Sequence, residues 1–392
     1  MTLGVQYRAG MSRAFLDAAS GQPLHPAAIE AENTLRDRTW ADPNARHHEG
    51  VAARVVLDAA RATVASILQT PAQTITFSPS SPAALRTILD GLGHLDRPRW
   101  LCSTIERVVV RETLQCWAPH LHPMDPDVDP TDIPVISTDR TGRIDPNSLR
   151  DQLAALGASE HPVVVVLQAA NAEIGTVQDL AALISVCRGY DCFVIVDASN
   201  ALGYVELPAG WDALFADAGT WAGPPAAAVV AVAESSGWRG SGASRAPADS
   251  IDVNVAVQAA AALDAVHRNE NERNRISELT QRLRDELPSL IEDLEIFGDE
   301  HNRLPQVLSF SLLYVDAERL ATELDRMGIA VGSGSACAAA AGLPSHVLSA
   351  IGALTHGNVR VSVPWNCPTE SIDALLEQLP SAVESIRRDA GV

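Results

Sequence analysis

The chain contains no lysine: all 29 basic residues among its 392 are arginines. Lysine is normally one of the commonest amino acids, so about eight would be expected even at a depleted usage near 2%. A coding sequence rich in G and C would favour arginine and alanine and would account for most of the depletion. Whatever its origin, the absence excludes chemistry that needs an internal ε-amine, such as imine formation with an aldehyde.

Long hydrophobic runs and an excess of positive charge are also missing. Apolar runs such as Val163–Leu167 are far shorter than the roughly 20 residues of a membrane span, and the first thirty residues lack the basic and apolar parts of a signal peptide. Forty-nine acidic residues against 29 basic ones give a net charge of −20. Such a chain repels the phosphates of nucleic acids and anionic membranes. We therefore expect a cytoplasmic protein with neither kind of partner.

Paired cysteines and histidine clusters are absent as well. The six cysteines show no CxxC spacing and not the density of a secreted disulfide scaffold. His47 and His48 are adjacent, so their side chains diverge, and His120 and His122 lack a third ligand. We expect neither a disulfide scaffold nor a bound metal.

Helical and strand patterns alternate along the first two-thirds of the chain. Residues 50–69 place apolar groups at helical spacing. Val163–Leu167, Phe193–Val196 and Ala226–Val232 are continuous apolar runs of strand length, typical of strands buried on both faces of a parallel sheet. Leu180–Arg188 is the expected crossover helix. The alternation predicts a three-layer α/β domain with right-handed crossovers.

A second unit follows near the C-terminus, and the length of the chain predicts two domains, since single cores stop growing at roughly 250–300 residues. A long helix is expected over 252–286. The further expected elements are strands Val307–Leu312 and Asn358–Val363 and helices Ala317–Met327 and Thr369–Arg388. We place a large α/β domain at 1–250, whose N-terminal arm 1–14 packs on the small domain. Residues 251–392 form the long helix and a small α+β domain.

Five segments resemble, in order and spacing, those of the cysteine desulfurases. They are FLDAASGQPLHP near the start, NAEIGTVQDL at 171–180, IVDASNALG at 195–203, GSGSACAAAAGLPSHVLSAIG at 332–352 and HGNVRVSV at 356–363. Cysteine desulfurases belong to the class V aminotransferase group of pyridoxal-phosphate (PLP) enzymes. The resemblance implies PLP fold type I, with a three-layer α/β/α large domain and a smaller C-terminal α+β domain.

The resemblance also implies roles for five residues. Asp197 would pair with the PLP ring nitrogen, and Asn171 and Asn200 would touch the ring oxygen. Arg360 would bind the substrate carboxylate, and Cys337 would carry a persulfide. The residues alone leave other interpretations open: a turn cap for Asp197, turn chemistry for the asparagines, a surface salt bridge for Arg360 and a buried, inert thiol for Cys337.

Other parts of the family's site are replaced. Thr220 stands where the resemblance places the Schiff-base lysine, and Asp217 stands at a phosphate-binding serine. A carboxylate and a phosphate charge about 4 Å apart repel by roughly 4 kcal/mol at an effective dielectric near 20. Pro82 replaces a phosphate-binding threonine, and Arg107 replaces the ring-stacking histidine. We therefore expect no cofactor, with covalent PLP excluded and non-covalent PLP weak, and PLP-dependent activity absent or very weak.

Three functions remain open at this point. In the first, Cys337 accepts or carries a persulfide sulfur between a donor and an acceptor protein. In the second, the chain is a scaffold or regulatory subunit, either a homodimer or a heterodimer with a desulfurase-like chain in which Ser250 completes the partner's site. In the third, the remodelled pocket, lined by Arg360, Arg107, Asp197 and Asp217, binds a zwitterionic small molecule in a PLP-independent enzyme.

Overall fold

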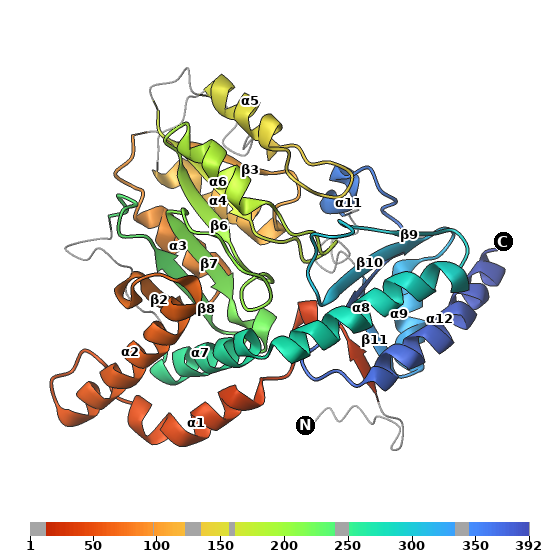
Figure 1. Cartoon of the computed structure of the whole chain (residues 1–392), viewed down its shortest axis with the longest axis horizontal. Coiled ribbons are helices and arrows are strands. Elements are labelled where there is room, and N and C mark those ends of the chain that lie inside the picture. The colour runs from red at the N-terminus through yellow and green to blue at the C-terminus, as the bar shows by residue number, and fades with distance from the viewer. Residues whose placement is uncertain are drawn as a thin grey trace.

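Two β-sheets organise the molecule (Figure 1). The computed structural model describes residues 13–96, 98–121, 135–156, 161–239, 251–333 and 345–391. The larger sheet has the strand order β2-β8-β7-β6-β5-β3-β4, and the smaller one β1-β11-β12-β10-β9. The predicted α/β class is confirmed.

The larger sheet is parallel at its centre and antiparallel at one side. Strands β3 to β7 run parallel to one another, whereas β8 runs antiparallel to both β7 and β2. The predicted strands at β5, β6 and β8 are present. The strand bounds are β2 Ile75–Ser78, β3 Arg99–Ser103, β4 Val135–Ile136, β5 Val163–Gln168, β6 Phe193–Asp197, β7 Ala213–Asp217 and β8 Ala228–Val232.

Alternate residues of β5 belong to two different cores, which explains its continuous apolar run. Val163, Val165 and Leu167 pack in the cluster with α1, α2, α5, α6 and α7. Val164 and Val166 pack in the cluster with α3 and α4. Helices therefore cover both faces of the sheet, as three layers require. The bounds are α1 Pro26–Thr39, α2 His48–Leu68, α3 Ser81–Asp90, α4 Val108–Leu121, α5 Pro146–Leu156, α6 Leu180–Arg188 and α7 Val253–Arg268.

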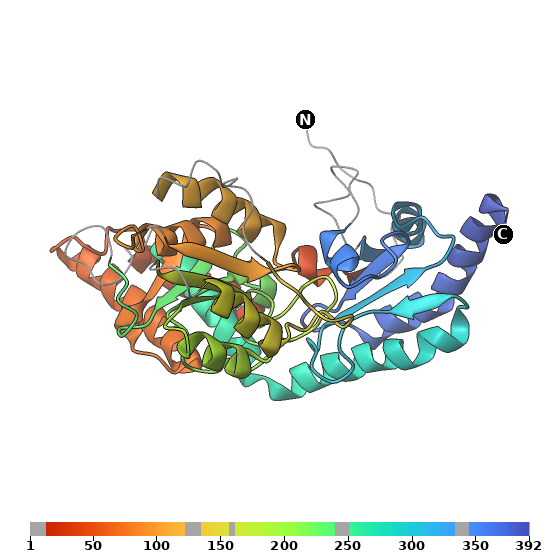
Figure 2. The ribbon, with the colours of Figure 1, turned by 90° about the horizontal axis from the view of Figure 1, so that it is seen from above.

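The smaller sheet forms a second lobe beside the first (Figure 2). Its N-terminal strand β1, Ala14–Leu16, pairs in parallel with β11, Ile329–Ser333. The expected arm 1–14 lies outside the described residues except at its last two positions. The division at 250/251 stays a prediction. The other elements of this lobe are α8 Glu270–Leu290, β9 Leu294–Ile296, β10 Val307–Leu312, α9 Ala317–Arg326, α11 His346–Ala350, β12 Asn358–Ser362 and α12 Thr369–Ala390. Short 3-10 helices lie elsewhere in the described chain: η1 Ala18–Ser20, η2 Ala72–Thr74 and η3 Ala218–Trp221.

The single long helix predicted over 252–286 is wrong, because the chain forms two helices that meet at Asn269. The backbone of Asn269 leaves the helical region, with φ −90° and ψ 74°. Its side-chain oxygen accepts a hydrogen bond from the Glu272 N–H at 3.1 Å. Asn269 therefore caps the start of α8, and its capping bond stabilises the break.

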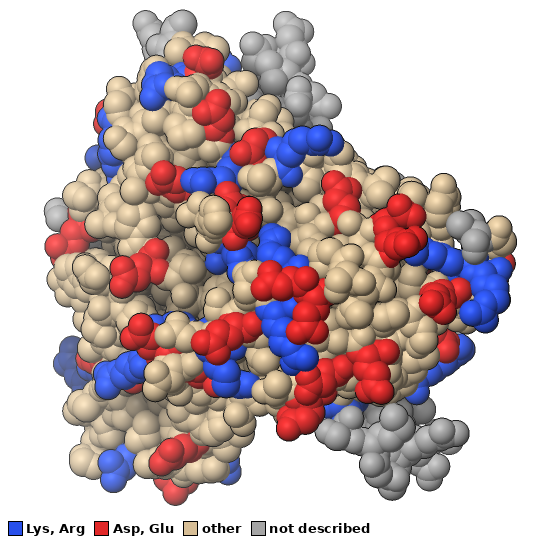
Figure 3. Space-filling model, turned by 45° about the vertical axis from the view of Figure 1, so that its right-hand side comes forward, with Lys and Arg blue, Asp and Glu red and all other residues tan. Residues whose placement is uncertain are grey.

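The surface carries arginines and carboxylates side by side. Figure 3 shows blue and red side chains interleaved on one face of the molecule. On α8, Arg282 pairs with both Glu286 and Asp373. None of the helices in the described part of the chain is long and apolar enough to cross a bilayer.

Candidate functional site

The carboxyl ends of three adjacent parallel strands bring polar side chains to one edge of the larger sheet. Gln168 ends β5, Asp197 ends β6 and Asp217 ends β7. Gln168 and Asp197 lie directly opposite each other in the register of the two strands. This edge is where open parallel sheets bind ligands.

Arg107 and Asp197 form the central ion pair of this edge. Arg107 Nε donates to Asp197 Oδ2 at 2.5 Å, and Arg107 Nη2 donates to Ser199 Oγ at 3.1 Å. The Asp197 side chain is 2% exposed and that of Arg107 23%. Burial acts to lower the pKa of Arg107, but the charge and hydrogen bond of Asp197 outweigh it and raise the pKa. The second oxygen of Asp197 accepts from Ser199 N, so this carboxylate is fully engaged within the protein.

Asp217 and Thr220 form a compact turn after β7. Asp217 Oδ1 accepts from Gly219 N at 3.1 Å, and Asp217 Oδ2 accepts from Ser81 Oγ at 3.3 Å. Thr220 Oγ1 donates to the Asp217 carbonyl oxygen at 2.7 Å and accepts from Asn200 N at 3.3 Å. Burial raises the pKa of Asp217. The Thr220 hydroxyl therefore closes the turn.

Asn171 and Asn200 both lie at turns near this edge. The Asn171 amide donates to Ile105 O and to Gln168 Oε1, each at 3.1 Å, and its side-chain oxygen accepts from Ile174 N at 3.0 Å. Asn200 adopts the left-handed conformation, with φ 67°. The turn chemistry that the sequence left open is thus present at Asn171, and the ligand roles of both asparagines stay predictions.

Arg360 reaches the site from the smaller sheet. From β12, its Nη2 donates to Asp17 Oδ1 at 3.0 Å and to Ser20 Oγ at 2.8 Å. Its buried Nε has no partner among the described residues. The ion pair joins the N-terminal segment to the C-terminal sheet, and the guanidinium keeps a donor unused.

Two carboxylates at the site escaped the sequence analysis. Glu106 is fully buried beside Arg107, and its Oε2 has no partner among the described residues. Burial, together with the charge of Asp197, raises the pKa of Glu106 to about 8. Burial also raises the pKa of Glu173 to about 7, although a Ser345 hydrogen bond and the Arg360 charge oppose it. Glu106 directly precedes Arg107, and Glu173 lies two residues after Asn171. This closeness in sequence to predicted site residues was the available signal.

The structure thus brings Arg107, Asp197 and Asp217 into one network. Cys337, the predicted persulfide carrier, lies outside the described residues, and so does Ser250. Among the described residues no cluster of three or more histidine, cysteine or acidic side chains could hold a metal ion.

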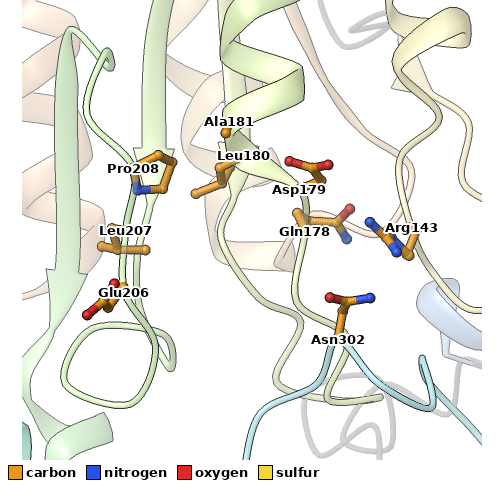
Figure 4. A pocket seen from close by; sticks show the side chains of 9 residues that line it. All are labelled: Arg143, Gln178, Asp179, Leu180, Ala181, Glu206, Leu207, Pro208 and Asn302. Atoms are coloured by element: carbon orange, nitrogen blue, oxygen red, sulfur yellow. The ribbon is translucent and has the colours of Figure 1, made fainter.

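A separate cleft of about 510 Å³ opens at the amino end of α6 (Figure 4). In Figure 4 the segment Glu206–Pro208 faces Asp179, Gln178 and Arg143 across this cleft. The lining residues are Arg143, Gln178, Asp179, Leu180, Ala181, Glu206, Leu207, Pro208 and Asn302. None of them is a predicted site residue.

Solved NifS-like proteins share this fold. One superposes with a TM-score of 0.81 at 20% identity, over 95% of this chain and 100% of that chain. A NifS-like protein from Rickettsia africae superposes with a TM-score of 0.80 at 21% identity, over 96% and 100% of the two chains. At these identities the likeness establishes the fold, and the predicted fold type I is confirmed.

Curated relatives align with the chain almost from end to end. Cysteine desulfurase IscS of Dictyoglomus turgidum is 25% identical over 95% of each chain. The IscS-like cysteine desulfurase of Mycobacterium tuberculosis is 27% identical over 96% of this chain and 98% of its own. The family model for class-V aminotransferases matches residues 14–209 and 232–375. The predicted resemblance is confirmed, and the chain is cysteine desulfurase-like.

These findings correct the expectation that the chain takes no cofactor. Class V aminotransferases and cysteine desulfurases are PLP-dependent, so the match points to a family of PLP enzymes. The expectation weighed individual substitutions against the whole and gave too little weight to a match that covers most of the chain. PLP is the cofactor that the family indicates.

The described side chains, as arranged here, do not fit this cofactor in the manner of the family. The carboxylate expected at the ring nitrogen, Asp197, is occupied by Arg107 and by Ser199 N. Asp217, at the expected phosphate position, presents an acceptor where phosphate oxygens would need donors, and Thr220 uses its hydroxyl within the turn.

The family match covers most of the chain around these departures but omits residues 210–231, which include Asp217 and Thr220. The family model begins at Ala14 in β1 and ends within α12, so it spans strands of both sheets. The relatives align over the same length. The chain belongs to the class-V aminotransferase family.

Proposed function

We propose that this cysteine desulfurase-like chain works in sulfur transfer, with the Cys337 thiol accepting a sulfur atom and passing it on as a persulfide. The names of the curated relatives support the general activity. Cys337 stands in the GSGSAC run, at the position that matches the family's persulfide cysteine. The observation that carries the proposal is where the described residues on either side of segment 334–344 lie: both lie at the candidate site.

The first flank lies at Arg360. Gly332, in β11, pairs with Arg360 in β12. A Cβ added at Gly332 would lie 2.6 Å from Asp17 Oδ1 and 3.2 Å from Arg360 Nη2. The chain therefore passes directly beside this ion pair at Gly332, which precedes Cys337 by five residues in the sequence.

The second flank lies at the two buried carboxylates. Ser345 hydrogen-bonds Glu173, and His346 Nε2 lies 2.8 Å from the Glu106 carbonyl oxygen. Burial lowers the pKa of His346, so its ring is neutral at pH 7. Both ends of the segment that contains Cys337 thus start from the candidate site.

The proposed step needs no oxidant. The Cys337 thiolate attacks the terminal sulfur of a donor persulfide, R–S–SH. A new S–S bond forms on Cys337, the donor S–S bond breaks, and the donor leaves as R–SH after taking up a proton. Attack by an acceptor thiolate on the same sulfur of the Cys337 persulfide passes it onward by the same exchange.

The partners in this proposal are proteins. The donor is a cysteine desulfurase that carries a persulfide, and the acceptor is a protein thiol in the cytoplasm. We further propose that the chain is dimeric, as its resemblance to the cysteine desulfurases implies.

Intact mass spectrometry tests the proposal. The purified chain is mixed with L-cysteine and a PLP-loaded active desulfurase, and C337A serves as the control. A gain of one sulfur atom that the variant does not show is the expected result. No gain on a wild-type Cys337 that alkylation shows to be reactive would overturn the carrier role.

A pairing role is the second candidate, and the Arg107–Asp197 network favours it. Arg107 and Asp197 neutralise each other's charge and fill each other's hydrogen-bonding positions. The chain can therefore present a folded, charge-balanced site to a partner subunit without catalysing a reaction itself. Co-purification with an active desulfurase, retained in C337A, is the result that would identify this role.

A further inference from the structure

Cys187 and Cys192 are two buried cysteines that neither proposed function uses. They are the first and last residues of the run CRGYDC, in which α6 ends and the chain turns toward β6. Their exposed fractions are 0% and 2%. Both side chains belong to the core cluster on the α6 face of the larger sheet.

The backbone of this turn places the two cysteines side by side. Cys192 N donates to Cys187 O at 3.2 Å, and Asp191 N donates to Arg188 O at 3.4 Å. Asp191 lies between them in the left-handed conformation, with φ 53°. These two bonds and this conformation define a Schellman motif, which usually brings the side chains at the two cysteine positions into contact.

The two side chains lie in the same core cluster, and Cys192 Sγ donates to the Tyr190 carbonyl oxygen at 3.8 Å. The interaction between the two thiols raises the pKa of Cys187 and lowers the pKa of Cys192. Cys192 is therefore the better nucleophile of the pair.

Arg188 fixes the turn to the neighbouring loop. Its Nη1 donates to Cys192 O at 3.3 Å, and its Nε donates to Gly210 O at 3.1 Å. Its Nη2 pairs with Asp212 Oδ2 at 2.9 Å, and the same oxygen accepts from Val194 N at the start of β6. The turn that carries both cysteines is therefore held from both sides.

We propose that Cys187 and Cys192 are a redox-active pair, a modification site that small disulfides convert to an internal disulfide. The Cys192 thiolate attacks an oxidant R–S–S–R, forming a mixed disulfide and releasing R–SH. The Cys187 thiolate then attacks the Cys192 sulfur and displaces the second R–SH. The two cysteines lose two protons and two electrons, and the oxidant is reduced to two thiols. Because both thiols are buried, the rate is set by opening of the turn.

The position of Arg188 between the cysteines gives a direct test. Cleavage after arginine yields peptides 151–188 and 189–239, each with a single cysteine. The folded chain is treated with 2-hydroxyethyl disulfide, quenched with N-ethylmaleimide in denaturant and digested. The expected product is the two peptides joined, lighter than their sum by two hydrogen atoms and separated by a reductant.

Three controls make the result decisive. Exposed Cys116 reports that the oxidant reached the protein, and C187S and C192S must each abolish the joined peptide. A parallel sample in urea shows whether folding is needed. Recovery of both peptides with N-ethylmaleimide while Cys116 is modified, or joining only in urea, would overturn the proposal.

Discussion

Arg107 holds Asp197 through a 2.5 Å hydrogen bond between Nε and Oδ2, so the residue expected at the ring-stacking position neutralises the carboxylate expected at the ring nitrogen. The same guanidinium contacts Ser199, whose hydroxyl accepts from Asp217 N. One arginine therefore links the ends of β6 and β7.

Replacing Arg107 by methionine should destabilise the protein strongly. The variant keeps the side-chain volume but leaves Asp197 buried without a cation, and breaking a buried pair from one side costs about 3–5 kcal/mol. Chemical denaturation measures the loss. The double variant R107M/D197N should recover part of this lost stability, since no buried charge is left unpaired.

As a matched control, R282Q removes an exposed pair on α8 and should change stability by about 1 kcal/mol or less. Equal losses in both single variants would contradict the expectation.

The contribution of Glu106 to the stability of the protein should fall as pH rises from about 5 to 8, whereas buried His25 and His346, whose pKa values burial lowers, contribute in the opposite direction. The pKa of Glu106 rises from 4.5 to about 8 on folding. Between these values the folded chain keeps a proton that the unfolded chain has lost, so stability decreases by up to about 1.4 kcal/mol per pH unit. Below 4.5 both states hold the proton, and the contribution is fully present. Urea denaturation at several pH values measures the slope.

Two glutamine variants separate the carboxylates responsible for this pH dependence. E106Q should flatten the profile up to about pH 8, because the amide cannot titrate. E173Q should flatten it only up to about pH 7, the folded pKa of Glu173. An E106Q profile as steep as that of the unmodified chain would show that Glu106 ionises normally in the folded protein.

The sequence predicts strands β5, β6 and β8 of the larger sheet, because the signals of these strands are local. The apolar run of β5 and the helical spacing of α6 were recognised at nearly the observed bounds. The break at Asn269 also had a local signal, an asparagine with a glutamate three residues later, which the uninterrupted polar pattern of α8 concealed. The pairing of β1 with β11 had none, since three residues of strand acquire their register only from a partner more than three hundred positions away.

The sequence predicts which residues belong to the candidate site, but it does not predict which of them contact one another. Motif matching identified Arg107, Asp197 and Asp217 individually, but nothing in the sequence states that Arg107 bonds Asp197. Glu106 was missed because a glutamate at a helix start usually faces solvent, and only the folded core around it reveals the burial that shifts its pKa. Long-range geometry of this kind follows from the assembled sheet.

Gly332→Ala should weaken the attachment of the N-terminal segment to the smaller sheet. The new methyl group would lie 2.6 Å from Asp17 Oδ1, so the Asp17–Arg360 pair must separate or the strands must shift. Overpacking of this kind costs about 1–3 kcal/mol. Denaturation measures the loss of stability, and hydrogen exchange over residues 14–20 should accelerate.

Gly189→Ala is the control, because its Cβ approaches Val186 O only to 3.3 Å at an exposed helix end. This variant should change stability by about 0.5 kcal/mol or less. Unchanged exchange in G332A would contradict the expected displacement.

Thr220→Lys places the only ε-amine of the chain at the position that matches the family's Schiff-base lysine. With PLP and borohydride, this variant should gain a reduced PLP adduct on the peptide that contains residue 220, because an imine forms on a primary amine. D217S/T220K should load at lower PLP concentration, since the second change removes a carboxylate from the expected phosphate position and its repulsion of roughly 4 kcal/mol per charge pair at 4 Å. Peptide mapping locates the adduct, and D217S alone controls for PLP held without the amine. Labelling confined to the N-terminal amine in both lysine variants would show that this edge of the sheet does not present residue 220 to the cofactor.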